Sequence, residues 1–167
     1  MGIDGIKPFI DDCKKYNKGI FILVKTSNKS SGDLQDLKLE DGKTVYEKVA
    51  ELVNSWGEDL IGENGYSSVS SVVGATYPEQ LKILRKIMPA SYFLIPGYGA
   101  QGGKAEDIAL GFDEHGLGGI VNASRSLMCA FKSDKWKDEF SDEDYAKATR
   151  AEAIRMRDEL LTAIKMK

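Results

Sequence analysis

The sequence is poor in the residues that build disulfide frameworks and metal centres. It has two cysteines, one histidine and four prolines among 167 residues. Cys13 and Cys129 have neither CxxC spacing nor a second pair, so we interpret both as reduced thiols that serve as small apolar side chains. His115 lies in the sequence DEHG, which is typical of a solvated loop and not of a catalytic base. The chain therefore gives no pattern for a disulfide-rich domain or a metal site.

Long apolar runs and blocks of basic residues are also missing. The longest apolar stretches have about five residues, far fewer than the roughly 20 that cross a bilayer, and the amino terminus lacks the apolar core of a signal peptide. The net charge is −3, and no basic block is longer than Lys14-Lys15 or Lys165-x-Lys167. The sequence therefore predicts a cytoplasmic protein with neither a membrane nor a nucleic acid as partner.

The chain does contain a repeated unit, in which an apolar run is followed by a polar turn and then by a helical pattern. The apolar runs predict four strands, near residues 20–25, 67–75, 92–96 and 118–122, within a single domain over 1–167. Four strand-then-helix units indicate an α/β fold with a parallel sheet. Periodicity does not decide between an open sheet and part of a closed (β/α)₈ barrel, which usually takes about 250 residues.

Capping patterns predict where two helices begin. Thr44-x-x-Glu47 is a capping box before a helix, and Ser141-x-x-Asp144 predicts the start of a long carboxyl-terminal helix over 142–165. The apolar spacing within this last helix predicts an inward face with five members: Tyr145, Ala148, Ile154, Leu161 and Ile164.

The segments after the third and fourth strands predict an anion site. Residues 96–103 contain four glycines and Gln101, and Arg125 follows the fourth strand. Backbone N–H groups between Gly99 and Gly103, the Gln101 amide and the Arg125 guanidinium could converge on a phosphate. The alternative is that the glycines only form a tight turn and that Arg125 pairs with a nearby carboxylate.

Two further polar segments have less specific patterns. Residues 26–28, Thr-Ser-Asn, follow the first strand and could read the polar edge of a ring or cap their own turn. Asp36, Lys38 and Asp41 form an alternating set that could hold an ammonium between carboxylates. They follow no strand, so a solvated charged loop is the expected structure.

Four motifs, in this order and at these intervals, resemble orotidine 5′-phosphate decarboxylases of the bacterial type with a long TSN loop: VKTSNKSSGDLQ, VGATYPEQL, FLIPGYGAQGG and VNASRSLMCAF. The similarity runs from Ile3 to about Phe131. It implies the second half of a (β/α)₈ barrel from a family of homodimers. These enzymes convert orotidine monophosphate to UMP and CO₂ without a cofactor or a metal.

The resemblance implies roles for residues at the strand ends. Five positions would bind the 5′-phosphate: Gln101, Arg125 and the backbone amides around Gly99, Gly102 and Ser124. Three would hold the pyrimidine: Ser27 or its neighbour Thr26 at the ring edge, and Pro96 beside the ring.

The family's catalytic D-x-K-x-x-D set belongs to the half of the barrel expected before Met1, so we expect no catalytic residue in this chain. Asp36, Lys38 and Asp41 repeat its letters at the wrong place in the order of strands. The chain would then hold orotidine monophosphate or UMP and need the missing amino-terminal half-barrel or a second copy of itself. The alternative is a non-enzymatic nucleotide-binding or self-associating module. A sugar-phosphate isomerase would need a strand-end general base, and no His or Glu is placed for one.

Overall fold

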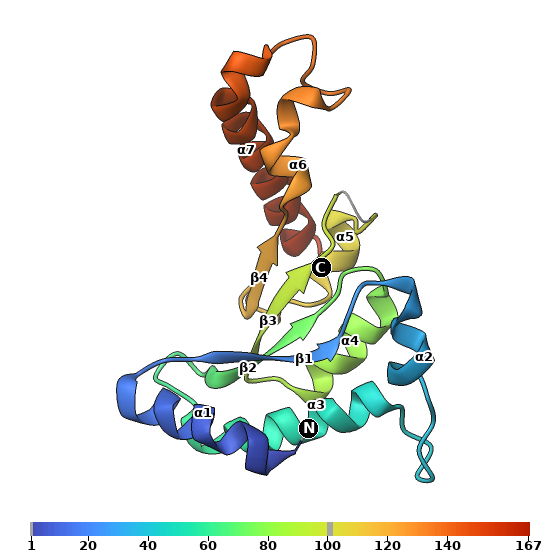
Figure 1. Cartoon of the computed structure of the whole chain (residues 1–167), viewed down its shortest axis with the longest axis vertical. Coiled ribbons are helices and arrows are strands. Elements are labelled where there is room, and N and C mark those ends of the chain that lie inside the picture. The colour runs from blue at the N-terminus through green and yellow to red at the C-terminus, as the bar shows by residue number, and fades with distance from the viewer. Residues whose placement is uncertain (1, 100–101) are drawn as a thin grey trace.

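The structure, a computed structural model, describes residues 2–99 and 102–167. These residues form a sheet in the order β1-β2-β3-β4 in which every neighbouring pair is parallel. The strands are β1 (Ile20–Lys25), β2 (Ser67–Val73), β3 (Ser91–Pro96) and β4 (Gly119–Asn122). Helical segments lie between successive strands (Figure 1). The predicted α/β class with four consecutive parallel β/α units is confirmed.

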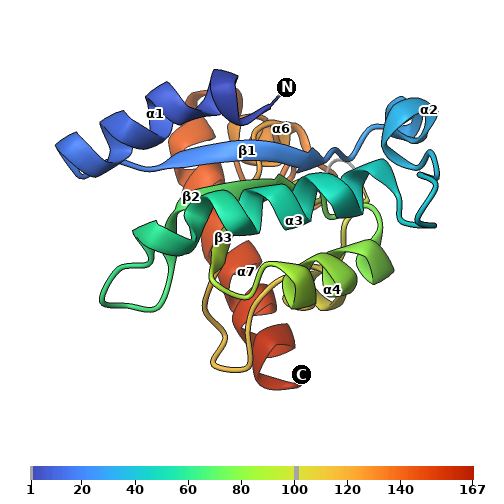
Figure 2. The same cartoon turned by 90° about the horizontal axis from the view of Figure 1, so that it is seen from below.

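The helices lie mainly on one side of this sheet. They are α1 (Ile3–Tyr16), α2 (Gly32–Gln35), α3 (Val45–Gly57), α4 (Pro78–Ile87), α5 (Ala105–Ala109), α6 (Arg125–Met128) and α7 (Tyr145–Lys165). Figure 2 shows α3 and α4 side by side next to the sheet, with α1 along β1. In Figure 1, α7 extends past the end of β4 with α6 beside it. One face of the sheet is therefore covered and the other has no layer of helices.

The covered face holds the core. Alternate residues of the strands point toward α3 and α4, and Val69, Val73, Phe93 and Ile95 are fully buried there. The helices contribute leucines and small residues at helical spacing: Ala50, Val53, Leu81 and Leu84. The apolar runs of the strands and the apolar positions of the helices in the sequence are therefore the residues that meet in this core.

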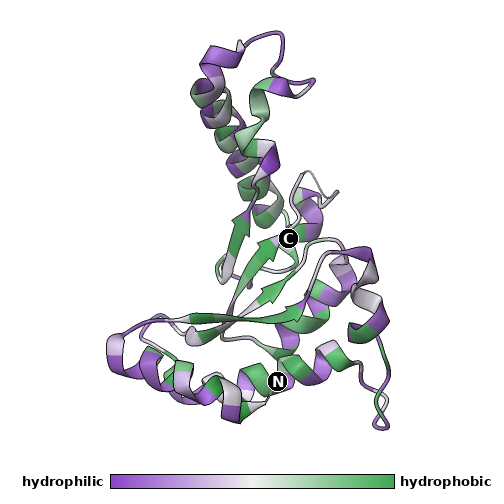
Figure 3. Cartoon of the chain, viewed as in Figure 1, coloured by the Kyte–Doolittle hydropathy of each residue, from purple (hydrophilic) through white to green (hydrophobic). Residues whose placement is uncertain are grey.

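The opposite face, which we call the inner face, carries an apolar row that crosses all four strands. The strand register places Leu23 beside Val72, Val72 beside Leu94, and Leu94 beside Ile120. The two ends of this row are open to solvent, with Leu23 56% and Ile120 44% exposed. Figure 3 shows hydrophobic colour on the strands of the sheet, the two edge strands β1 and β4 included. We call these four residues the inner-face row.

The two capping predictions have different outcomes. The Thr44 hydroxyl accepts from the Glu47 backbone N–H, and the Glu47 carboxylate accepts from the Thr44 N–H, so this capping box is confirmed. The prediction for Ser141 is wrong. Its hydroxyl donates to the Asp144 carboxylate at 2.8 Å instead of accepting from the backbone, and α7 begins only after a 3₁₀ turn at Asp142–Asp144.

The inward face of α7 also differs from its prediction. The predicted members Tyr145, Ile154 and Leu161 are exposed, whereas Ala148 is buried as expected. The face that packs onto α5 and α6 also carries Glu152, whose burial is possible because its carboxylate is fully hydrogen-bonded. Apolar spacing alone misses this face because one of its members is charged.

None of the helices in residues 2–99 and 102–167 has the length and apolar composition needed to span a membrane.

Candidate functional site

The carboxyl ends of the parallel strands lie along one edge of the sheet, and the loops that follow them touch one another in chain order. A Cβ atom placed on Gly74, after β2, would lie 2.7 Å from the backbone nitrogen of Ser27, after β1. A Cβ on Gly103, after β3, would lie 2.9 Å from Cβ of Ala75. Only glycine permits these approaches, so the strand-end loops form a continuous rim.

The turn after β3 is built by glycines. We call its described part, residues 97–99 and 102–103, the glycine loop. Gly97, Gly99 and Gly102 have φ of 104°, 72° and 91°. Residues with a side chain rarely adopt such positive φ angles. The N–H groups of Gly99 and Gly102 donate to Gly103 O at 3.2 Å and to Gly99 O at 2.9 Å. The tight turn considered as an alternative is therefore present, and phosphate contacts through these two amides, which stay a prediction, would have to share or open these bonds.

The glycine loop meets the start of α6. A Cβ on Gly99 would lie 3.0 Å from Ser126 Oγ, next to Arg125, the first residue of α6. Ser124 precedes α6, and its carbonyl accepts from the backbone N–H groups of Leu127 and Met128. The segments PGYGAQGG and NASRS, separate in the sequence, thus lie together.

Arg125 is exposed, and in the described part of the chain nothing accepts a hydrogen bond or forms an ion pair with its guanidinium. The alternative in which Arg125 pairs with a carboxylate is therefore not observed among residues 2–99 and 102–167. Gln101, the other predicted phosphate ligand, lies outside the described residues. An exposed guanidinium on a residue adjacent to one that contacts a glycine turn is suited to binding an oxyanion there.

The turn after β1 is held by its own polar groups. The Thr26 hydroxyl donates to Asn28 Oδ1 at 2.6 Å, and the Thr26 N–H donates to Gln35 Oε1 at 3.1 Å. The Ser27 carbonyl accepts from Thr76 Oγ1 at 3.1 Å. These bonds fix the turn against the loop after β2. Thr26 therefore has a local structural role in addition to the ring contact predicted for it.

Pro96 ends β3 on the inner face. Its register partner is Asn122, the last residue of β4, and Pro96 is half-buried. It follows Leu94 of the inner-face row by two residues, so both belong to the same face of β3. Its position is compatible with a ring above the carboxyl edge of the sheet.

A buried lysine, which the sequence pattern did not predict, lies behind this rim. Lys25, the last residue of β1, has a side chain only 1% exposed, and its ammonium pairs with Asp36 at 2.7 Å. The ammonium also lies over the rings of Tyr46 and Tyr77, at 5.5 and 5.1 Å from their centroids. Because Asp36 lies after α2, the ion pair ties the polar loop to the end of β1.

The set Asp36, Lys38 and Asp41 does not act as a cluster. Asp36 pairs with Lys25, whereas the exposed Asp41 accepts from the Lys43 backbone N–H. All three residues are exposed, as expected of a solvated loop, and the ion pair that Asp36 forms with the buried Lys25 is the one contact that the pattern did not predict. This arrangement offers no ammonium held between two carboxylates, as a D-x-K-x-x-D catalytic set would require.

A second buried cation lies at the other end of the sheet. The guanidinium of Arg85 in α4 donates to the carbonyls of Ser91, Gly111 and Gly118 at 2.7 to 2.8 Å, and lies 3.7 Å from the centroid of the Phe93 ring. Burial lowers the pKa of Arg85 to about 10. All its donors point to backbone carbonyls, so Arg85 is a structural residue and not a ligand-binding one.

The remaining reactive side chains are dispersed. Cys13 is buried, but Cys129 is exposed, so the expectation that both thiols pack as small apolar groups is wrong for Cys129. His115 is exposed next to Glu114, as expected of a solvated loop. In residues 2–99 and 102–167, no group of three or more His, Cys, Asp or Glu side chains is arranged to hold a metal ion.

A comparison with protein families shows which family the chain belongs to. The family model "Orotidine 5′-phosphate decarboxylase / HUMPS family" matches residues 1–132, which include all the strand-end loops described above. The chain belongs to this family. The match includes the glycine loop, the turn after β1 and Arg125, and it ends before α7.

Curated relatives and solved structures agree with this assignment. The orotidine 5′-phosphate decarboxylase of Caldicellulosiruptor bescii is 54% identical over 133 residues, covering 80% of this chain and 43% of the relative. That of Clostridium tetani is 46% identical over 167 residues, covering 100% of this chain and 56% of the relative. The chain spans about half the length of the curated relatives it matches.

Among solved structures, Leishmania donovani OMP decarboxylase gives a TM-score of 0.68 at 31% identity, covering 96% of this chain and 54% of that one. A Streptomyces avermitilis structure, also named as an orotidine 5′-phosphate decarboxylase, gives a TM-score of 0.72 at 25% identity. This match covers 98% of this chain and 52% of that one. The fold is therefore α/β, and its four consecutive β/α units make half of a (β/α)₈ barrel.

Proposed function

We propose that this chain, 1–167, is the carboxyl-terminal, substrate-holding half of an orotidine 5′-phosphate decarboxylase. The enzyme would convert orotidine monophosphate to UMP and CO₂ in pyrimidine biosynthesis. The observation that carries this proposal is the contact between Gly99 of the glycine loop and Ser126 at the start of α6. Arg125 is the neighbour of Ser126, and its guanidinium has no partner among residues 2–99 and 102–167.

The 5′-phosphate would bind at this contact. Arg125 supplies the charge and two parallel donors, and Gln101, from the same segment as the glycine loop, supplies an amide. The backbone amides around Gly99, Gly102 and Ser124 complete the predicted set. In barrels of this kind, the loops after the last two strands commonly hold phosphate, and here those are the loops after β3 and β4.

The pyrimidine would lie further along the same rim, toward β1. Ser27 and Thr26 follow β1, Pro96 ends β3, and β2 lies between these two strands. A nucleotide whose phosphate lies at Arg125 would therefore extend across the inner edge of the sheet. Phosphate binding would then supply energy that positions the base for reaction. No role in decarboxylation itself is proposed for the residues of this chain.

The other half of the barrel would supply the catalytic residues and cover the inner face. The inner-face row ends in exposed aliphatic side chains on β1 and β4, the two edge strands. Apolar edges of this kind favour association with further strands. Four more β/α units would bring the total to eight. The cytoplasmic location and the homodimer expected from the sequence stay predictions.

A binding measurement tests the assignment. The chain is mixed with the amino-terminal half of the Clostridium tetani relative, and UMP and uridine are titrated separately by calorimetry. We expect UMP to bind more tightly than uridine, and Arg125→Ala to weaken UMP binding by about 10- to 100-fold while uridine is unaffected. The matched control is Arg150→Ala, an exposed arginine of α7.

Equal UMP binding by wild type and Arg125→Ala would remove the phosphate role. The alternative, a self-associating half-barrel without enzymatic activity, is separated by the mass of the purified chain. A stable pair of identical chains that binds UMP and excludes the amino-terminal half would support that alternative, because two copies also bring eight strands together.

A further inference from the structure

The glycine loop is held by the carboxyl-terminal helix through Tyr98. The Tyr98 side chain is almost fully buried, and its hydroxyl donates to Glu159 Oε2 in α7 at 2.8 Å. Another α7 residue, Met156, has its terminal carbon 3.5 Å from the position that a Cβ on Gly99 would take. Helix α7 therefore contacts two consecutive residues of the loop.

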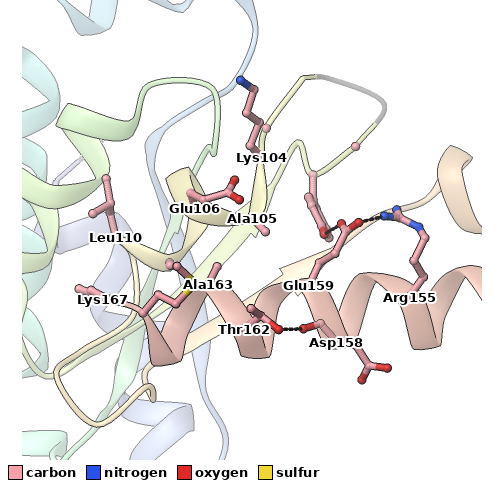
Figure 4. A pocket seen from close by; sticks show the side chains of 15 residues that line it. Lys104, Ala105, Glu106, Leu110, Arg155, Asp158, Glu159, Thr162, Ala163 and Lys167 are labelled. Atoms are coloured by element: carbon pink, nitrogen blue, oxygen red, sulfur yellow. Dashed lines mark hydrogen bonds and ion pairs between the residues drawn. The ribbon is translucent and has the colours of Figure 1, made fainter.

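Glu159 is itself fixed by a chain of charged contacts. Its other oxygen pairs with Arg155, one turn earlier in α7, and Arg155 donates to both oxygens of Glu152 at 2.8 and 2.7 Å. Glu152 also accepts from Trp136 Nε1 at 2.8 Å. Figure 4 shows Glu159 and Arg155 reaching toward each other from α7. These contacts restrict the conformations available to the Glu159 carboxylate.

The two partners have complementary protonation states. Burial, together with the neighbouring Glu159 carboxylate, raises the pKa of the Tyr98 hydroxyl, so it stays a donor at neutral pH. The hydrogen bond from Tyr98 lowers the pKa of Glu159, so the carboxylate stays charged. The contact is thus a charge-assisted hydrogen bond, a class stronger than the bond between two neutral groups.

The loop needs an external support of this kind. Three of its glycines have positive φ, and glycine loses more conformational freedom on ordering than any other residue. On one side the loop borders a cavity of about 1040 Å³ between α5 and α7, so packing from that side is incomplete. Tyr98 is the one residue of the glycine loop with a side chain, and hence the one that can be tethered through a side chain.

We propose that Glu159 is a positioning residue for the phosphate site: by holding the Tyr98 hydroxyl it keeps the glycine loop ordered against α6. These contacts involve four residues beyond residue 132, where the match to the family model ends: Trp136, Glu152, Arg155 and Glu159. The assignment of the ordered site to phosphate rests on the proposed function. The ordering of the loop stands independently of any ligand.

The ordering is tested by hydrogen–deuterium exchange of the ligand-free 167-residue chain. Tyr98→Phe and Glu159→Ala should each speed exchange at the amides of Gly99, Gly102 and Gly103 by about tenfold, because each removes the same bond. The two effects should not add in the double variant. Glu159→Gln, whose amide oxygen still accepts from Tyr98, should restore most of the protection.

The matched control is Asp158→Asn. Asp158 precedes Glu159 in α7 and borders the same cavity, but its carboxylate pairs with the exposed Arg157 and not with the loop. Exchange at the three glycine amides should be unchanged in this variant. Unchanged exchange in Tyr98→Phe and Glu159→Ala, or equal acceleration in Asp158→Asn, would overturn the proposal.

A second readout connects the tether to phosphate binding. In the mixture with the amino-terminal half, Glu159→Ala should weaken UMP binding by about tenfold and leave uridine binding unchanged. An equal loss for both ligands would indicate general unfolding and would contradict a positioning role. If wild type fails to bind UMP, the proposed function fails, while the exchange experiment still decides whether Glu159 orders the loop.

Discussion

The two faces of the sheet are built from the same strands but differ in what covers them. On the covered face, Val69, Val73, Phe93 and Ile95 are fully buried under α3 and α4. On the inner face, the inner-face row is aligned just as well but is exposed at both ends. The covered face is complete within this chain, whereas the inner face has the composition of a core without its cover. This difference is the structural sign of half a barrel.

Polar groups show the same contrast. The two buried cations have partners within the chain: Arg85 donates to backbone carbonyls, and Lys25 pairs with Asp36 and lies over two rings. At the rim of the inner face, Arg125 has no partner among the described residues. Arg125 is exposed to solvent and needs no protein partner, so its guanidinium stays available for the anion contact proposed above.

The largest effect is expected for Arg85 on the covered side. Arg85→Met keeps much of the side-chain volume but removes the guanidinium donors from the carbonyls of Ser91, Gly111 and Gly118. The Gly118 carbonyl then keeps only its bond from the Phe93 N–H. The free energy of unfolding should fall by about 3–5 kcal/mol, measured by urea denaturation. Arg150→Met, on the exposed side of α7, is the control and should change it little. A small effect for Arg85→Met would mean that water replaces the guanidinium.

The same substitution on the two faces tests the comparison directly. Ile95→Ala, on the covered face of β3, should cost about 2–5 kcal/mol of the free energy of unfolding. Ile120→Ala, on the inner face of neighbouring β4, should cost at most about 1 kcal/mol in the chain alone. When the amino-terminal half is added, Ile120→Ala should weaken the association of the two halves. Similar costs for both variants in the chain alone would show that the inner face is already covered.

The polar loop supplies a sharper pair. Asp36→Asn leaves the buried Lys25 ammonium without its carboxylate and should reduce the free energy of unfolding by about 1–3 kcal/mol. Asp41→Asn, five residues later and exposed, should have almost no effect. Thermal unfolding of both variants checks this. Equal effects would mean that the ion pair between Asp36 and the buried Lys25 does not stabilise the fold.

The smallest effect concerns the start of α3. Hydrogen bonds from the Thr44 hydroxyl and N–H lower the pKa of the Glu47 carboxyl. Since the pKa is lowered on folding, the stabilisation is present above the unfolded pKa of about 4.3 and is lost as the pH falls through the folded pKa. Thr44→Val should cost about 1 kcal/mol at pH 7, and the difference from wild type should shrink below pH 4. A difference independent of pH would assign the cap to Thr44 alone.

Much of the fold follows from local pattern. The apolar run at 20–24 and the Thr44–Glu47 spacing each specify an element that the structure contains. The glycines after β3 specify a turn that only glycine can make. These features depend on residues close together in the sequence.

The features that the sequence did not predict depend on distant partners. Lys25 can be buried because Asp36, Tyr46 and Tyr77 all contact its ammonium. The spacing of these residues in the sequence does not predict that they meet. Glu152 is buried because Trp136 and Arg155 satisfy it, so apolar periodicity misplaced the inward face of α7. The residues proposed for the phosphate and pyrimidine sites came from the sequence pattern and the family resemblance. The tether from Glu159 to Tyr98 needed the structure, because 61 positions separate the two.

The most direct test of the half-barrel account is the release of CO₂ from orotidine monophosphate. The chain alone, the amino-terminal half of the Clostridium tetani relative alone, and their mixture are assayed side by side. The account predicts that the chain alone releases none, that the mixture is active, and that Arg125→Ala lowers the activity of the mixture. Substantial turnover by the 167-residue chain alone would contradict it.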